Sequence, residues 1–209
     1  RVDRVDPPGG DFAATGCCLT CFAPAAAAVG VFWSAFDELP RLTVSAELQS
    51  WALERGSLTR RLRQHWSDTR VQVLSEALTP PLPHEAQALG LATGEAAWVR
   101  CVCLIGGDQA RIYARTVIPR WDAQNPWAEV QRLGDQPLGE LLFTLPDLER
   151  SPFEWALNAP WPEAMARPSA NCPEVLARRC TFVRGHAPLL LTEVFLQLSH
   201  TTPCANSSA

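Results

Sequence analysis

An acidic side chain interrupts an apolar run near the end of the 209-residue chain. The segment PLLLTEVFL, residues 188–196, surrounds Glu193 with leucine, valine and phenylalanine. On a strand, alternate side chains point to opposite faces, so Glu193 shares one face with Leu191 and Phe195. A carboxylate there loses water, which favours its protonated form unless a cation or hydrogen-bond donors compensate. Glu193 is therefore interpreted as a proton donor to a ligand, as one half of a buried ion pair, or as a residue at a strand edge whose carboxylate reaches solvent.

A cation is expected at a comparable position on another strand. In AWVRCVCLI, Arg100 alternates with Trp98 and Val102 on one predicted face. Arginine holds a carboxylate through two parallel hydrogen bonds, and we expect the binding partner to be a small molecule. Arg178 and Arg179 open another predicted strand, and we expect at least one of them to keep its guanidinium in water.

Helices and strands must position these residues. Apolar residues at helical spacing predict helices over 45–53 and 57–66, the second capped by Ser57. Turns with glycine at 106–108 and 185–187 join neighbouring strands as hairpins, so the sheet is mostly antiparallel. A loop with a short helix follows the first strand, and residues 125–143 predict two short helices, broken at Gly134, that can act as lids. Strands are predicted at residues 69–78, 97–105, 110–118, 148–157, 178–184 and 189–197.

Helices followed by strands indicate an α+β fold: a single six-stranded antiparallel sheet with flanking helices over its apolar faces. We assign this domain to residues 42–198, with a proline-rich surface excursion at 159–173. Residues 1–41 are expected to be a poorly ordered or extraneous extension, and residues 199–209 a frayed tail.

Composition argues against several classes of function. The net charge is −4, and the 18 basic residues, all arginine, are scattered, which disfavours a nucleic-acid surface. The apolar run at 22–33 is too short for a transmembrane helix, so we expect a cytoplasmic protein without stable membrane insertion. Cys101 and Cys103 share a strand face and are interpreted as small buried side chains. We expect no metal; a site formed by Cys17, Cys18 and Cys21 is the weakest alternative.

Four segments carry a resemblance to a known family: WVRCVCLI, ARTVIP, LGDQPLGELLF and RRCTFVRGHAPLLLTEVFL. In this order and at these spacings they resemble the chorismate lyase family of the bacterial ubiquinone pathway, over residues 42–198. The resemblance implies a six-stranded antiparallel sheet whose ligand site is closed by two helical lids. It also implies a carbon–oxygen lyase that converts chorismate to 4-hydroxybenzoate and pyruvate without a metal or organic cofactor. We expect this enzyme to be a monomer.

The resemblance also assigns residues. It places the ring carboxylate of the substrate on Arg100 and the 4-oxygen on Glu193, with Leu138 contributing through its backbone. Leu58 stands where the family has methionine and keeps the apolar volume. To these residues we add Arg115 as a second cation for the side-chain carboxylate. Because the product fits the same site, we expect strong product inhibition.

A non-catalytic function is the main alternative. The same sheet architecture resembles the effector-binding domain of GntR-type regulators, which bind a metabolite without converting it. Those regulators carry an N-terminal winged helix, and no basic recognition helix is predicted before Ser45. The pairing of a buried acid with a buried cation favours the lyase.

Overall fold

The computed structural model describes residues 32–35, 44–122, 124–146, 148–157, 159 and 175–198. Most of the expected extension at 1–41, the excursion after residue 159 and the tail at 199–209 lie outside the described residues, so the domain boundaries stay predictions. Within the expected extension, Ser34 forms an antiparallel bridge with Trp155, which attaches this short stretch to the sheet.

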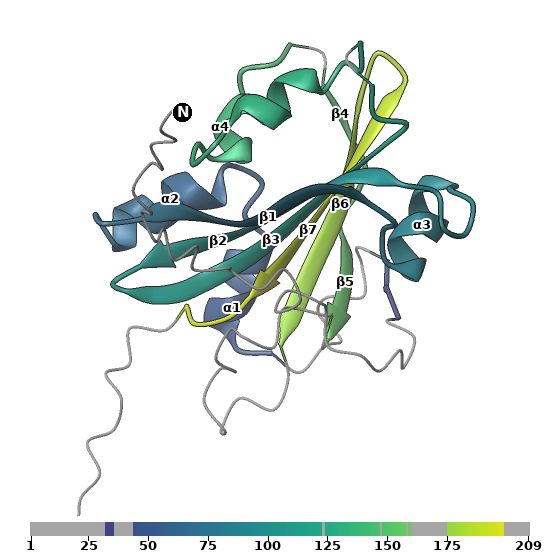
Figure 1. Cartoon of the computed structure of the whole chain (residues 1–209). Helices are drawn as coiled ribbons and strands as arrows, with labels where there is room; N and C mark the ends of the chain where they lie inside the picture. Colours follow the sequence, from purple (N-terminus) through teal and green to yellow (C-terminus); the bar gives the residue numbers. More distant parts are fainter. Residues whose placement is uncertain are drawn as a thin grey trace, which may run out of the picture.

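In the part of the chain that the structure describes, seven strands form one antiparallel sheet (Figure 1). The order is β1-β2-β3-β7-β6-β4, and β5 also pairs with β6. The predicted fourth strand is divided into β4 and β5, because Pro152 lies between them and has no N–H for the ladder. The predicted α+β fold with a single antiparallel sheet is confirmed. The strands are β1 (Arg70–Thr79), β2 (Ala97–Gly106), β3 (Gln109–Pro119), β4 (Glu149–Arg150), β5 (Glu154–Leu157), β6 (Leu176–Arg184) and β7 (Ala187–Phe195).

Both predicted hairpins have two-residue turns. Gly107 and Asp108 join β2 to β3, and Gly185 with His186 joins β6 to β7. All four residues have positive φ angles, between 54° and 69°, as the type I′ turns that match strand twist require. The second turn fixes the register of β6 against β7, and therefore which side chain lies opposite Glu193.

The helices begin and end close to the predicted positions. The hydroxyls of Ser45 and Ser57 accept hydrogen bonds from the Leu48 and Arg60 amides and so cap the first two helices. Gly134, with a φ of 53°, lies between the two short helices of the predicted lid. The helices are α1 (Ala46–Ala52), α2 (Leu58–His65), α3 (Pro83–Leu89), the 3-10 helix η3 (Ala128–Arg132) and α4 (Leu138–Leu142).

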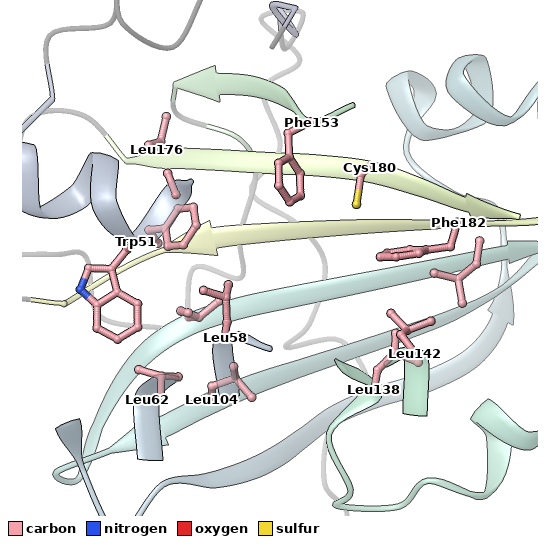
Figure 2. Packing of buried hydrophobic residues seen from close by; sticks show 14 of the residues in the cluster. Trp51, Leu58, Leu62, Leu104, Leu138, Leu142, Phe153, Leu176, Cys180 and Phe182 are labelled. Atoms are coloured by element: carbon pink, nitrogen blue, oxygen red, sulfur yellow. The ribbon is translucent and has the colours of Figure 1, made fainter. Parts of the chain in front are cut away.

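Different helices cover the two faces of the sheet. One face, which carries Arg100 and Glu193 and is called the cavity face here, packs against α1, α2, η3 and α4. In this cluster, Trp51, Leu58 and Leu62 lie at one end, with Leu138 and Leu142 of α4 at the other (Figure 2). The opposite face, called the α3 face, packs partly against α3, which lies apart from α2 and α4 (Figure 1). The apolar character predicted for both faces of β7 is thereby explained.

Two β-bulges decide which charged side chains reach the cavity face. The register of β1 against β2 shifts between Val73 and Ser75, leaving Leu74 as the extra residue. Likewise, Leu104 pairs with Ile112 and Ile105 with Ala110, so Arg111 is the extra residue in β3. An extra residue reverses the alternation of all side chains beyond it.

Candidate active site

A small cavity lies between the sheet and two helices. It encloses about 50 Å³ and is lined by residues of four strands and by the starts of α2 and α4. Arg100, Glu193, Leu58 and Leu138 all line it, so the structure brings together these four predicted residues. The remaining lining residues are Ser57, Thr59, Val71, Val102, Leu104, Ala114, Thr116, Pro137, Gly139 and Leu191.

Glu193 forms an ion pair with a second arginine, Arg178. The Nε atom of Arg178 donates to Oε2 of Glu193 at 2.7 Å. The Nη1 atom of Arg178 donates to the carbonyl oxygens of Ala52 and Glu54 at the end of α1, and its guanidinium lies 4.3 Å from the ring centre of Phe153. Arg178 is therefore the cation that compensates burial of Glu193, and it fixes this carboxylate relative to α1.

Arg100, on β2, is almost fully buried, with an exposed fraction of only 1%. Its Nε atom donates to Oε1 of Glu76 at 2.7 Å. Its Nη2 atom donates to the carbonyl oxygens of Gly134 and Gln136, in the link between η3 and α4. Among the described residues, Nη1 has no hydrogen-bond partner, so this nitrogen can donate to a ligand. Arg100 thus joins the sheet to the lid while keeping one nitrogen for binding.

Arg115 is not part of this cavity, and our expectation that it faces the substrate is corrected. The bulge at Arg111 places Arg115 opposite Cys101, and Thr116 opposite Arg100. Arg115 therefore points to the α3 face, where its Nε atom donates to Oε1 of the buried Glu85 at 2.7 Å. Without the bulge, counting from the turn would put Arg115 opposite Arg100 on the same face.

The expectation that Arg178 or Arg179 has an exposed head is also wrong. Their exposed fractions are 3% and 8%, because each pairs with a glutamate on a neighbouring strand: Arg178 with Glu193, and Arg179 with Glu154. The sequence reasoning missed Arg178 and Glu76 as partners of the site. Counting outward from the two-residue turn at Gly185–His186 would have placed Arg178 opposite Glu193.

The two helical segments over the cavity touch each other. A Cβ atom on Gly139 would lie 3.3 Å from the Oγ atom of Ser57, so glycine lets α4 approach the start of α2 closely. Arg63 of α2 also forms an ion pair with Glu140 of α4. The lids are thus connected to each other, and through Arg100 to the sheet.

A second polar group lies on the α3 face. The ring of His84 is tilted against that of Trp33, with the ring centres 5.8 Å apart, and its ring nitrogens have no hydrogen-bond partner among the described residues. Burial lowers the pKa of His84; Glu85 opposes this effect, and Arg179 and Arg115 add to it. The folded protein therefore disfavours a proton on this ring.

Acidification is expected to destabilise the fold through His84. The unfolded chain takes up a proton near pH 6.5, whereas the folded state resists it, so stability is retained above that pH and falls below it. The slope is at most about 1.4 kcal/mol per pH unit, reduced by the partial exposure of the ring. His84→Phe keeps an aromatic ring at this position and removes the titrating imidazole. Between about pH 7.5 and 5.5, chemical denaturation should show a larger loss of unfolding free energy in the wild type; equal losses would contradict this role.

The cysteines of the described segments take no part in the cavity. Cys101, Cys103 and Cys180 are buried and unpaired, and burial raises the pKa of Cys103 to about 12. The interpretation of Cys101 and Cys103 as small buried side chains is confirmed. Within the described segments, no three His, Cys, Asp or Glu side chains gather to hold a metal ion; Cys17, Cys18 and Cys21 lie outside them. In the same part of the chain, no helix combines the length and apolar character needed to cross a bilayer.

Comparison with solved structures finds a limited likeness. The C-terminal domain of PhnF is 18% identical, with coverage of 60% of this chain and 81% of that domain and a TM-score of 0.44. A GntR family transcriptional regulator from Bacillus cereus is 10% identical, with coverage of 65% and 97% and a TM-score of 0.41. Likeness at this level does not bear on function.

Comparison with protein families gives a more specific result. The sequence model of the family described as chorismate lyase matches residues 28–202. The probable chorismate pyruvate-lyase of Hydrogenovibrio crunogenus is 40% identical over 171 residues, which cover 80% of this chain and 91% of that protein. The protein of the same name from Thiobacillus denitrificans is 40% identical over 153 residues, which cover 71% and 82%. The chain therefore belongs to the chorismate lyase family of carbon–oxygen lyases.

Proposed function

We propose that this protein converts chorismate to 4-hydroxybenzoate and pyruvate. One observation carries the proposal: in a chain of this family, Arg100 and Glu193, from separate strands, line the same cavity. The four predicted residues found there have the chemistry that such a substrate needs. A cation suits the ring carboxylate, a carboxylate suits the ring hydroxyl, and Leu58 and Leu138 suit the ring itself.

The proposed reaction balances within the substrate. Chorismate carries an enolpyruvyl ether on the ring carbon next to the one that bears the hydroxyl. The bond between the ether-bearing ring carbon and the ether oxygen breaks, and the oxygen leaves with the electron pair of that bond. The hydroxyl-bearing carbon loses its hydrogen as a proton, and the electrons of that bond complete the aromatic ring. The departing enolpyruvate gains one proton and becomes pyruvate, so no electrons are exchanged with another reagent.

Each charged residue then has a separate task. Arg100 would bind the ring carboxylate through Nη1, because its Nε and Nη2 atoms already bond to Glu76 and the lid. A contact through one nitrogen thus replaces the two parallel hydrogen bonds that were expected from Arg100. Glu193 would accept a hydrogen bond from the ring hydroxyl and stabilise positive charge that develops on the ring as the ether leaves. Its ion pair with Arg178 favours this carboxylate role over that of a proton donor.

The cavity must widen to hold the ring. A cavity of about 150 Å³ is known to take up benzene, whereas this one encloses about 50 Å³. Because α2 and α4 form its roof, we expect them to move apart as the ligand passes and to close again over it. Opening would break the hydrogen bonds between Arg100 and the lid, which makes release of a bound ring slow.

The proposal is tested with purified protein and chorismate in excess EDTA. Formation of 4-hydroxybenzoate, followed by its absorbance, together with pyruvate in equal amount, is the expected result. Binding of 4-hydroxybenzoate without any turnover would instead favour a metabolite-sensing role.

We predict strong inhibition by the product. 4-Hydroxybenzoate has the carboxylate for Arg100 and the hydroxyl for Glu193, and it lacks the side chain that must leave. Added at micromolar concentrations, it should lower the initial rate competitively with chorismate. An initial rate that stays constant up to millimolar product would contradict this prediction.

The wider setting follows from the family resemblance. We propose that the 4-hydroxybenzoate feeds ubiquinone synthesis and that the enzyme works in the cytoplasm as a monomer, with chorismate and 4-hydroxybenzoate as its small-molecule partners. These statements stay predictions.

A further inference from the structure

A second, more open pocket lies beside the ion pair of Glu193. It has a volume of about 280 Å³ and is lined by Arg55, Arg150, Ser151, Pro152 and Phe153. These residues come from the link between α1 and α2, from β4, and from the link between β4 and β5. Its described lining contains two arginines and a hydroxyl and no carboxylate, so the pocket is suited to an anion.

Phe153 connects this pocket to the active site. Two guanidinium groups lie close to its ring, with Arg150 at 4.9 Å and Arg178 at 4.3 Å from its centre. Arg178 in turn binds Glu193. Burial raises the pKa of the nearby Cys180 thiol to about 12; the charge of Glu193 adds to this rise, and the charges of Arg178 and Arg150 oppose it. These three charged groups therefore lie near the same buried thiol.

The main chain before α2 links the two arginines as well. Arg178 donates to the carbonyl oxygens of Ala52 and Glu54, and Arg150 donates from Nη1 to that of Arg55 at 2.9 Å. The positions of Arg150 and Arg178 are thus fixed by the same short segment.

Arg150 differs from the other arginines near the site in its pairing. Arg100 and Arg178 each bind a glutamate. Arg150 is half-buried, and among the described residues no carboxylate lies within ion-pair distance of it. A partly desolvated guanidinium without an anion is well placed to bind the carboxylate of a ligand.

The substrate of the proposed function has a carboxylate for this position. With the ring carboxylate on Arg100 and the ring hydroxyl at Glu193, the enolpyruvyl group leaves the ring at the Glu193 end. Arg178 already donates hydrogen bonds to Glu193 and to two carbonyl groups. The next cation beyond Phe153 is Arg150.

We propose that Arg150 binds the side-chain carboxylate of chorismate and receives pyruvate after the ether breaks. This inference rests on the proposed function and deepens it. It assigns to Arg150 the task that the sequence had suggested for Arg115.

The test is Arg150→Met, which keeps the length and apolar stem of the side chain and removes the charge. The KM for chorismate should rise about 10- to 100-fold, the range for loss of a hydrogen bond to a charged group. The inhibition constant of 4-hydroxybenzoate, which has no side-chain carboxylate, should change by less than about threefold. Arg150→Lys should recover part of the lost affinity because it keeps the charge.

Arg70→Met serves as the matched control. It removes the same charge from an exposed pair with Asp108 at the far hairpin, and both constants should stay at their wild-type values. A direct probe is pyruvate added with saturating 4-hydroxybenzoate, which should raise the thermal midpoint of the wild type and not that of Arg150→Met.

The outcomes separate the two proposals. An inactive wild type would overturn the proposed function and this inference together. An active wild type with an unchanged KM in Arg150→Met would overturn this inference alone. A parallel rise in the KM for chorismate and the inhibition constant of 4-hydroxybenzoate would also overturn it, because Arg150 would then only support the fold.

Discussion

Glu193→Gln is expected to lower kcat for chorismate by about 10²- to 10⁴-fold, the range found when a positioned acidic or basic group is removed. Glutamine keeps the size of the side chain and can still hydrogen-bond the ring hydroxyl, so the loss reports the charge. The physical reason is that a carboxylate held by Arg178 at 2.7 Å needs no reorganisation when charge develops on the ring. The measurement is the steady-state rate of 4-hydroxybenzoate formation.

A second substitution at the same position separates charge from positioning. Glu193→Ala removes both the charge and the hydrogen bond. If Glu193 acts through its charge, the glutamine and alanine variants should be similarly slow. If Glu193 only positions the hydroxyl, the glutamine variant should keep most of the wild-type rate, and our assignment of its role would be wrong.

The chain offers a close control for this experiment. Glu154 also pairs with a buried arginine, Arg179, one residue along from Arg178 on β6. Arg179 points to the α3 face, so Glu154→Gln breaks a similar ion pair outside the cavity. It should leave kcat within about twofold of the wild type, as expected for a residue that touches no reacting group.

Much of the architecture could be predicted from the sequence, because the signals are local. The two-residue turns with glycine set both hairpins, and Ser45 and Ser57 mark the starts of α1 and α2. Pro152 divides the fourth predicted strand; this could have been predicted, because proline has no backbone N–H to donate to a neighbouring strand. The antiparallel sheet and its covering helices follow from these local features.

Placement of the charges was harder to predict, because it depends on bulges. A bulge adds one residue to one strand and has no reliable sequence signal. The bulge at Leu74 brings Glu76 opposite Arg100, and the bulge at Arg111 sends Arg115 to the α3 face. Arg111 is held in place by carbonyl oxygens of Gly106 and Gln197 and by the ring of Trp66, contacts that form only in the folded chain.

The pairing of Glu193 with Arg178 belongs to the predictable part. No bulge lies between the turn at Gly185–His186 and these two residues, so simple counting gives their register. Such counting would have favoured the buried ion pair among the interpretations of Glu193. It would also have shown that Arg178 is buried, because its partner strand carries the active-site carboxylate.

Arg100→Met is expected to weaken binding of 4-hydroxybenzoate by about 10- to 100-fold or more, through loss of a charge-assisted hydrogen bond to the ring carboxylate. The variant also leaves Glu76 and two lid carbonyls without their donor, so its free energy of unfolding should fall by about 2–5 kcal/mol. Arg100→Lys retains the charge but cannot bond Glu76, the lid and the ligand together, so it should restore only part of the affinity. Calorimetric titration with 4-hydroxybenzoate measures the affinity, and chemical denaturation measures the stability.

Loosening of the lid, without loss of a ligand contact, is the competing explanation for weak product binding in this variant. Arg184→Met tests it, because Arg184 binds Glu129 of η3 and the carbonyl oxygen of Pro126 without lining the cavity. If Arg100 binds the carboxylate directly, Arg184→Met should speed release of 4-hydroxybenzoate modestly and keep its affinity within about threefold of the wild type. If both variants lose affinity equally, then the ring carboxylate is held by the closed lid as a whole, and Arg100 is not its specific partner. Ligands that keep the phenol ring of 4-hydroxybenzoate and lack its carboxylate decide between these two explanations. They should bind the wild type and Arg100→Met alike only if Arg100 recognises the carboxylate.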